Sequence, residues 1–173
     1  MVIALLLIGC LKPSPPVQAA TRAPVRVAVV LESYDAPTVE LAPDPVQARI
    51  GDTLAARNLE PAPVDASAVA TFAQARSTEA RRGQLETDAV PVLLVECAPR
   101  FSAQVNGRYR WTVEVTASIG PEHPDARPFT VPVHLMYAHE QEEEAVIEAA
   151  PLVAREVGRL VDDWLGVSAT PAR

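Results

Sequence analysis

The sequence predicts an α+β domain, a two-layer sandwich in which helices cover one face of a mixed sheet of about four strands, in the order β-α-α-β-β-β-α. Residues 25–32 are a nearly continuous apolar, β-branched run, which is typical of a central strand buried on both faces. Residues 90–119 read as a hairpin around Asn106-Gly107, the strongest signal for a two-residue turn. Residues 140–165 repeat apolar side chains at helical spacing.

The N-terminus carries the most specific motif. Residues 2–8 form an unbroken apolar run, far shorter than the roughly 20 residues of a membrane-spanning helix, and Gly9 and Cys10 follow it. The segment LIGC at residues 7–10 resembles the bacterial lipobox, in which the cysteine is lipidated and the preceding peptide is removed. The resemblance implies a signal peptide over residues 1–9 and lipidation of Cys10. The alternative is an apolar N-terminus that ends in an ordinary buried cysteine.

The same resemblance implies an address. A lipidated Cys10 would hold the domain on a bacterial membrane, in the periplasm, and Leu11 in place of an acidic residue implies the outer membrane. No Lys or Arg precedes Lys12, and we expect the basic start of the signal peptide to lie upstream of Met1. Residues 10–24 are rich in proline and read as a tether. We expect a single domain over residues 25–166 and a frayed tail over residues 167–173.

Composition and charge limit the kinds of partner that the chain can bind. The net charge is −7, and the basic residues do not cluster, which argues against a nucleic-acid partner and against electrostatic adhesion to anionic lipid. Only two cysteines are present. If Cys10 carries lipid, Cys97 has no intrachain partner, and we expect it to be buried and structural.

Two helices are predicted after the first strand, which is followed by a loop over residues 33–43. The first begins at Asp44, with Pro45 in the first turn and Gln47 completing a capping box, and it ends near Asn58. Its apolar stripe is Val46, Ile50 and Leu54. Residues 59–64 contain two prolines and predict at best a short edge strand. A second helix is expected over residues 65–82, with Asp65 as its N-cap and Gly83 as its end. Its side chains expected to face the core are those of Val69, Phe72 and Ala73.

The hairpin needs one irregularity. A two-residue turn at Asn106-Gly107 pairs Ser102 with Trp111 and leaves Cys97 on the polar side of the sheet. We therefore expect a β-bulge near residues 98–99, which returns the apolar side chains of the first strand to the core.

The last strand and helix complete the domain. After a polar loop over residues 120–127, residues 129–137 predict an edge strand, because Pro132 cannot donate to a ladder. In the helix over residues 140–165, Pro151 either kinks the axis or begins a second half. The residues expected to face inward are Val146, Ala150, Val153, Val157, Leu160, Val161 and Trp164.

The polar face of the sheet is the candidate binding surface. The core side of the second hairpin strand carries Trp111, and three helices are expected to cover that side, which leaves nothing for the other side. The residues expected to point away from the helices, with His134 beside them, are Arg110, Thr112, Glu114, Thr116 and Ser118. We expect this flat surface to bind a protein partner of the cell envelope. The alternative is a merely solvated face.

No catalytic or metal motif is present. His139 opens an HEQEE segment that lacks the second histidine of a zinc-binding HExxH, so a solvated helix start is the simpler interpretation. His123 and His134 fit a turn and a strand surface, and no histidine lies near Cys97 in the sequence. We expect no enzymatic activity, no cofactor and no bound metal.

The order of elements resembles a group of periplasmic lipoprotein domains. The segments that carry this resemblance are VRVAVVLE, ARNLEPAPV, PVLLVECAPRF and RYRWTVEVTASI, followed by the long last helix. Together with the lipobox they resemble the TolB amino-terminal, CsgG-like and LpoB-like domains, and the lipopolysaccharide-assembly lipoprotein LptE has a similar order. The first resemblance implies a non-catalytic adaptor of an envelope machine. The second implies a lipoprotein that binds a small ligand or lipid.

Overall fold

The computed structural model describes residues 22–33, 38–72, 75, 77–86, 89–120, 123–135 and 142–166. It is a mixed α+β structure with an open six-stranded sheet in the order β2-β1-β4-β5-β6, and β3 pairs with β1. The elements are β1 (Ala23–Glu32), β2 (Val39–Leu41), α1 (Asp44–Ala55), β3 (Leu59–Pro63), α2 (Ala66–Phe72), α3 (Thr78–Leu85), β4 (Val92–Val105), β5 (Arg108–Ile119), β6 (His123–Leu135) and α4 (Glu142–Trp164).

Some expectations fall outside the described residues. These are the signal peptide over residues 1–9, the lipidation of Cys10, the tether up to residue 21, the inward side chains of Phe72 and Ala73, the segment around His139 and the tail from residue 167. The tether was expected to reach residue 24, but Pro24 already lies in β1. Among the described residues, no helix combines the length and apolar character needed to cross a membrane.

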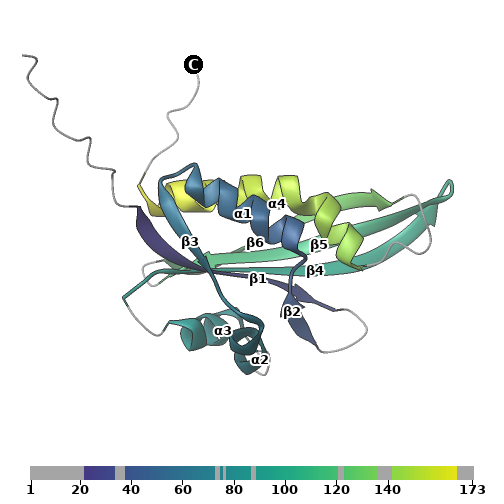
Figure 1. Cartoon of the computed structure of the whole chain (residues 1–173). Helices are drawn as coiled ribbons and strands as arrows, with labels where there is room; N and C mark the ends of the chain where they lie inside the picture. The colour runs from purple at the N-terminus through teal and green to yellow at the C-terminus, as the bar shows by residue number, and fades with distance from the viewer. Residues whose placement is uncertain are drawn as a thin grey trace, which may run out of the picture.

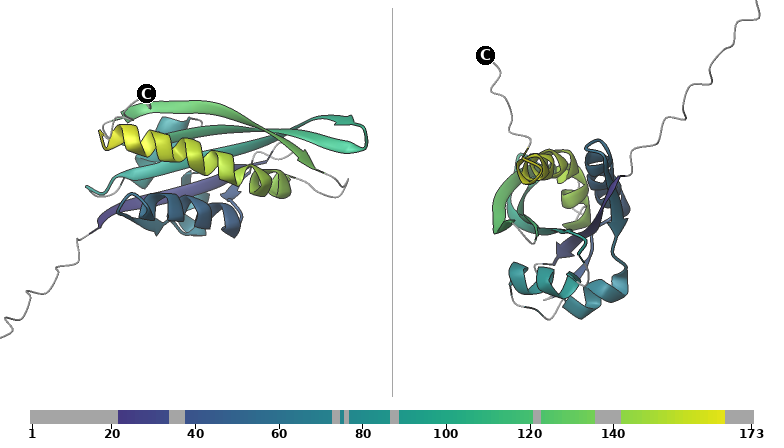
Figure 2. Two further views of the ribbon diagram at one scale, coloured as in Figure 1. Left: turned by 90° about the horizontal axis from the view of Figure 1, so that it is seen from above. Right: turned by 90° about the vertical axis from the view of Figure 1, so that its left-hand side faces the viewer.

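The helices cover both faces of the sheet, so the expectation of helices on one face is wrong. Figure 1 and the end-on view in Figure 2 show α1 and α4 on one side and α2 and α3 on the other. The strand order explains this arrangement, because β3 and β4 are both parallel to β1 and lie on opposite sides of it. Crossovers between parallel strands are right-handed, so a connection that reverses its direction across the sheet must pass over the opposite face.

β1 is the centre of two apolar cores, as its composition predicts. Val27 and Val29 join the larger core beneath α1 and α4. Ala28 and Val30 join a smaller core beneath α2 and α3. Both faces of β1 are therefore buried, and the segment expected as a loop before α1 contributes the short strand β2, which pairs with the end of β1.

α1 forms where expected, but its start is different. Val46, Ile50 and Leu54 are fully buried. The N-cap is Pro43 without a side-chain cap, so the predicted capping box is absent, and the Gln47 side chain instead donates to the Ala42 carbonyl at 2.7 Å. A proline in the first turn presets the backbone without needing that cap.

The boundaries after α1 are partly as predicted. Asn58 has φ of 61°, which confirms the left-handed stop. β3 is the predicted short strand. The single helix expected over residues 65–82 is instead the pair α2 and α3, and Gly83 lies inside α3 rather than at its end. Asp65 caps α2, and hydrogen bonds donated to its carboxylate by the Ser67 hydroxyl at 2.7 Å and by the Ala68 amide at 2.8 Å lower its pKa.

The hairpin is confirmed and its bulge is displaced. Asn106 and Gly107 have φ of 52° and 77°, the conformation that a type I′ turn requires. The register shift lies between Phe101 and Ala103, not at residues 98–99, so Phe101 pairs with Trp111. Bulging out Ser102 lets the Phe101 ring contact the Trp111 ring edge-on at 5.7 Å. A bulge at Ser102 directs the apolar side of β4 into the core, as the bulge expected at residues 98–99 would have done.

β6 and α4 close the structure. β6 begins at His123, earlier than expected, because it continues the ladder with β5 across a register shift opposite Ser118. Pro132 lies on this edge strand, as predicted. α4 is one helix that includes Pro151, and Pro151 lies on its exposed side. Its predicted inward residues are buried, apart from Trp164, which packs partly buried against the core.

Candidate functional site

The predicted polar face exists, but it is divided by α3. Along β5, Arg110 and Glu114 are exposed, while Thr112 and Thr116 are half-buried. His134 of β6 pairs with Arg110, which places it on this face as expected. The strand therefore presents polar side chains toward the hairpin turn and loses its exposure toward the opposite end.

Ser118 does not belong to the exposed surface. Its exposed fraction is 0%, and its partner in the ladder is Leu94, a member of the smaller core. The prediction failed here because it assumed that no segment covers this side, whereas α2 and α3 do. The Ser118 hydroxyl is buried without a hydrogen-bond partner among the described residues.

A buried ion pair fixes α3 to the sheet at the boundary of the exposed part. Glu96 of β4 is 5% exposed. Its carboxylate accepts from the Arg81 guanidinium and from the Thr78 hydroxyl of α3, each at 2.5 Å. Arg81 also lies 3.5 Å from a carboxylate oxygen of Glu32. A buried charge needs such partners, since an unpaired carboxylate would cost several kcal/mol.

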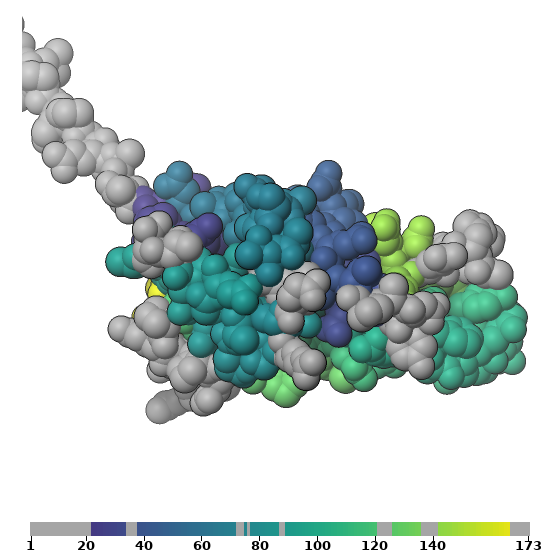
Figure 3. Space-filling view, turned by 90° about the horizontal axis from the view of Figure 1, so that it is seen from below, coloured from purple at the N-terminus to yellow at the C-terminus, as the bar shows by residue number. Residues whose placement is uncertain are grey.

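A polar cleft of about 420 Å³ opens beside this ion pair, between α3 and the exposed part of the sheet. Figure 3 shows the same side of the molecule from below. Arg100 of β4 and Glu114 of β5 lie on its outer side, 3.6 Å apart. The described lining residues are Glu32, Ser77, Thr78, Glu79, Arg81, Glu96, Ala98, Arg100, Glu114 and Thr116.

The cleft is lined mainly by charged and hydroxyl-bearing side chains. Its side chains offer carboxylates, guanidinium groups and hydroxyls, which can form ion pairs and hydrogen bonds with a polar partner. Among the residues that the structure describes, no cluster of His, Cys, Asp and Glu has the arrangement of a metal site. Neither Glu96 nor Arg81 was predicted from the sequence as part of a site. The available signal was a single carboxylate inside the apolar run VLLVECA.

Cys97 is buried, as predicted. Its exposed fraction is 0%, and it belongs to the larger core. Burial, together with the neighbouring charge of Glu96, raises the pKa of the thiol to about 12. A thiol that remains protonated at neutral pH is a poor nucleophile, so this position fits a structural role.

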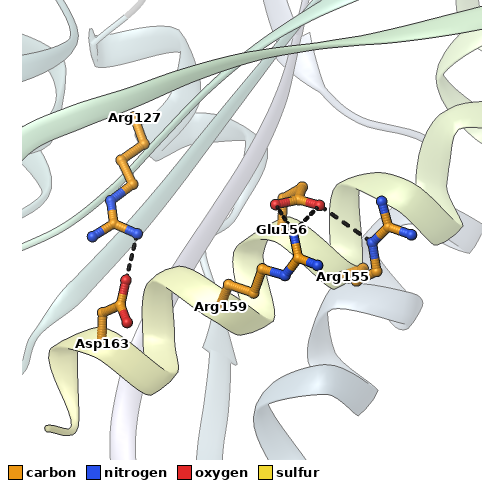
Figure 4. Close-up of polar contacts among 5 residues, drawn as sticks. All are labelled: Arg127, Arg155, Glu156, Arg159 and Asp163. Atoms are coloured by element: carbon orange, nitrogen blue, oxygen red, sulfur yellow. Dashed lines mark hydrogen bonds and ion pairs between the residues drawn. The ribbon is translucent and has the colours of Figure 1, made fainter. Parts of the chain in front are cut away.

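A second polar surface runs along α4 and the edge strand. Arg127 of β6 pairs with Asp163 at 2.5 Å, and Arg155 and Arg159 both contact Glu156 (Figure 4). The groove between these elements has a volume of about 370 Å³. Most of these side chains are about half exposed, and ion pairs of this kind contribute at most about 1 kcal/mol each. These ion pairs are typical of a solvated helix surface rather than of a binding site.

No family model matches this chain. No curated protein matches its sequence either. Solved structures with a similar arrangement include a minor lipoprotein from Acinetobacter baumannii, with 12% identity, a TM-score of 0.43, and coverage of 79% of this chain and 90% of that one. Lipoprotein GNA1162 from Neisseria meningitidis has 15% identity, a TM-score of 0.39, and coverage of 83% and 99%. Rare lipoprotein B from Shewanella oneidensis has 12% identity, a TM-score of 0.36, and coverage of 82% and 95%.

All three likenesses have TM-scores below 0.5 and identities of at most 15%. At this level they carry no argument about the activity or partners of this chain.

Proposed function

We propose that this chain is a lipid-anchored lipoprotein of the bacterial cell envelope that acts as a non-catalytic adaptor. The observation that carries the proposal is the LIGC motif ending in Cys10, followed by a folded domain whose first strand begins at Ala23. The intervening 12 residues, 11–22, would span roughly 37 Å if extended as polyproline II. Such a tether holds the domain near a membrane while leaving its surfaces accessible.

The exposed part of the polar face is the proposed contact with an envelope protein. It begins at the α3 cleft and extends along β4, β5 and β6 to the hairpin turn, where no described segment covers it. β1 begins at the opposite end of the sheet from that turn (Figure 1). A domain held through its N-terminus would therefore present the hairpin end away from the point of attachment.

The alternative is a lipoprotein that binds a small ligand or lipid. That function would need an enclosed apolar cavity between the sheet and its helices. The described residues there form a continuous buried cluster, with Ile50, Val153 and Val157 at 0% exposure. A filled core of this kind favours the adaptor.

Replacing Cys10 with Ala tests the anchor. We expect the wild-type chain to fractionate with membranes in a bacterial host and to incorporate labelled fatty acid, and the C10A variant to do neither. Firm membrane attachment of C10A would contradict the proposal.

The adaptor role is tested by recovering envelope proteins bound to the lipidated chain. Reversing both charges, with Arg110→Glu and Glu114→Arg, should weaken that recovery while far-UV circular dichroism remains unchanged. The matched control is Arg155→Glu with Glu156→Arg on the surface of α4. A folded Arg110/Glu114 variant that recovers the same partners as wild type would place the contact elsewhere.

A further inference from the structure

The exposed polar face carries opposite charge at its two ends. At the hairpin end, Arg108 and Arg110 are exposed, and neither forms an ion pair with a described residue. At the α3 end, the cleft is lined by four glutamates and two arginines, which gives 2 − 4 = −2. The two hairpin arginines contribute +2, so the charges of the two ends are equal and opposite.

The same face has a step in its shape. α3 stands out from the sheet over its covered end, while at the other end no helix of the described residues lies over this side of the outer β4–β5 hairpin (Figure 1). Three residue pairs of the β4–β5 ladder show this change along the strands. Leu94 and Ser118 lie under α3, and Glu96 and Thr116 line the cleft. Arg100 and Thr112 lie farther toward the hairpin turn.

We propose that two copies of this chain associate through this face as a symmetric dimer, with the hairpin arginines of each copy at the α3 cleft of the other. A twofold axis brings one patch against the same patch of the second copy, so residue i contacts j and j contacts i. Rotation by 180° places the raised, acidic end of one copy against the low, basic end of its partner. Both shape and charge are then matched twice. The proposal rests on the proposed use of this face for binding, with a second copy of the chain as the partner.

The charge of the whole chain does not oppose this arrangement at physiological salt. The net charge is −7, but repulsion between charges farther apart than about 8 Å is largely screened at 0.15 M ionic strength. Ion pairs formed in the cleft are close and partly shielded from water, so they are screened less. Complementary charge of this kind chiefly specifies which surfaces meet.

The test is a charge exchange between the two ends, read out by sedimentation equilibrium of the full chain in a density-matched nonionic detergent. The hairpin variant is Arg108→Glu with Arg110→Glu, and the cleft variant is Glu79→Lys with Glu114→Lys, all at exposed positions. Each pair alone should raise the dimer dissociation constant by at least about tenfold, equivalent to 1.4 kcal/mol. The four substitutions together should restore it to within about threefold of wild type, because opposite charges again face each other.

The matched control reverses two arginines away from this face. Arg22→Glu with Arg49→Glu changes the net charge by the same amount as the hairpin variant, at exposed positions before β1 and on α1. It should leave the dissociation constant unchanged. Each variant is checked by far-UV circular dichroism, and an unfolded variant is replaced by its single substitutions.

Three results would overturn the proposal. They are a wild-type chain that stays monomeric up to about 100 µM, a folded fourfold variant that is not restored, and a control that weakens the dimer as much as the hairpin variant. Binding of the wild-type chain to anionic vesicles that is lost in the hairpin variant, without any dimer, would assign the arginines to lipid instead. If the chain is monomeric but still recovers an envelope protein through Arg110 and Glu114, the dimer fails while the adaptor function stands.

Discussion

Removing the positive partner of Glu96 should destabilise the domain strongly. In Arg81→Leu, the Glu96 carboxylate stays buried without its guanidinium, and among the described residues only the Thr78 hydroxyl remains as a donor. Breaking a buried ion pair by removing one partner costs about 3–5 kcal/mol. Because the Arg81 side chain is 12% exposed and some water reaches it, we expect about 3 kcal/mol.

Two further variants separate the ion pair from the hydrogen bond. Thr78→Val keeps the ion pair and removes one hydrogen bond to a charged group, which should cost about 1.5 kcal/mol. Glu96→Leu combined with Arg81→Leu removes both charges from the interface, and apolar replacement of a buried pair is often neutral. The double variant should therefore lie within about 1 kcal/mol of wild type, far from the sum of its single substitutions.

The measurement is urea unfolding at pH 7, followed by far-UV circular dichroism. Hydrogen exchange should locate the effect of Arg81→Leu in α3, which the ion pair holds against β4. Arg127→Leu is the control, since its ion pair with Asp163 is exposed and should contribute less than about 1 kcal/mol. The reasoning is refuted if Arg81→Leu costs no more than Arg127→Leu, or if the double variant loses as much as the two single variants combined.

Three more predictions concern other parts of the fold. Cys97 should react with a thiol reagent at pH 8 only as fast as the domain unfolds, because burial raises its pKa to about 12, and rapid labelling of the native protein would contradict this. Gly107→Val should cost about 1–2 kcal/mol in urea unfolding, since a β-branched residue at φ of 77° is strained, and Gly83→Val on the exposed side of α3 should cost less. Arg57 lowers the pKa of Asp162, so this pair stabilises the fold above the unfolded pKa of about 3.9 and the contribution is lost as pH falls below it. Asp162→Asn should reduce stability at pH 7 by at most about 1 kcal/mol and flatten its decline below pH 4, and an unchanged pH profile would refute the assignment.

Local patterns in the sequence were sufficient for several of the separate elements, though not for β2 or for the division between α2 and α3. The two-residue period of β5, the stripe of α1 and the Asn106-Gly107 turn depend on neighbours within a few positions, and the structure confirms each of them. The inward face of α4 follows for the same reason, because residues three or four apart share one side of a helix. Sequence alone also indicated that β1 is buried on both faces.

Sequence alone did not determine what covers each face. A pattern shows that Ala28 and Val30 need cover, but not that α2 and α3 provide it. That depends on β3 and β4 lying on opposite sides of β1, because the handedness of the two crossovers then sends their helices to opposite faces. The burial of Ser118 follows from the same topology.

The candidate site was likewise only partly predictable from the sequence. Arg110 and Glu114 could be placed on one face from their alternation along a single strand. The pairing of Glu96 with Arg81 could not be predicted in this way. These residues lie 15 positions apart, one on a strand and the other on a helix, and the two elements meet only because the chain crosses the sheet. Periodicity determined which side chains share a surface, whereas the route of the chain between strands decided which surfaces remained open, because that route depends on contacts between residues far apart in the sequence.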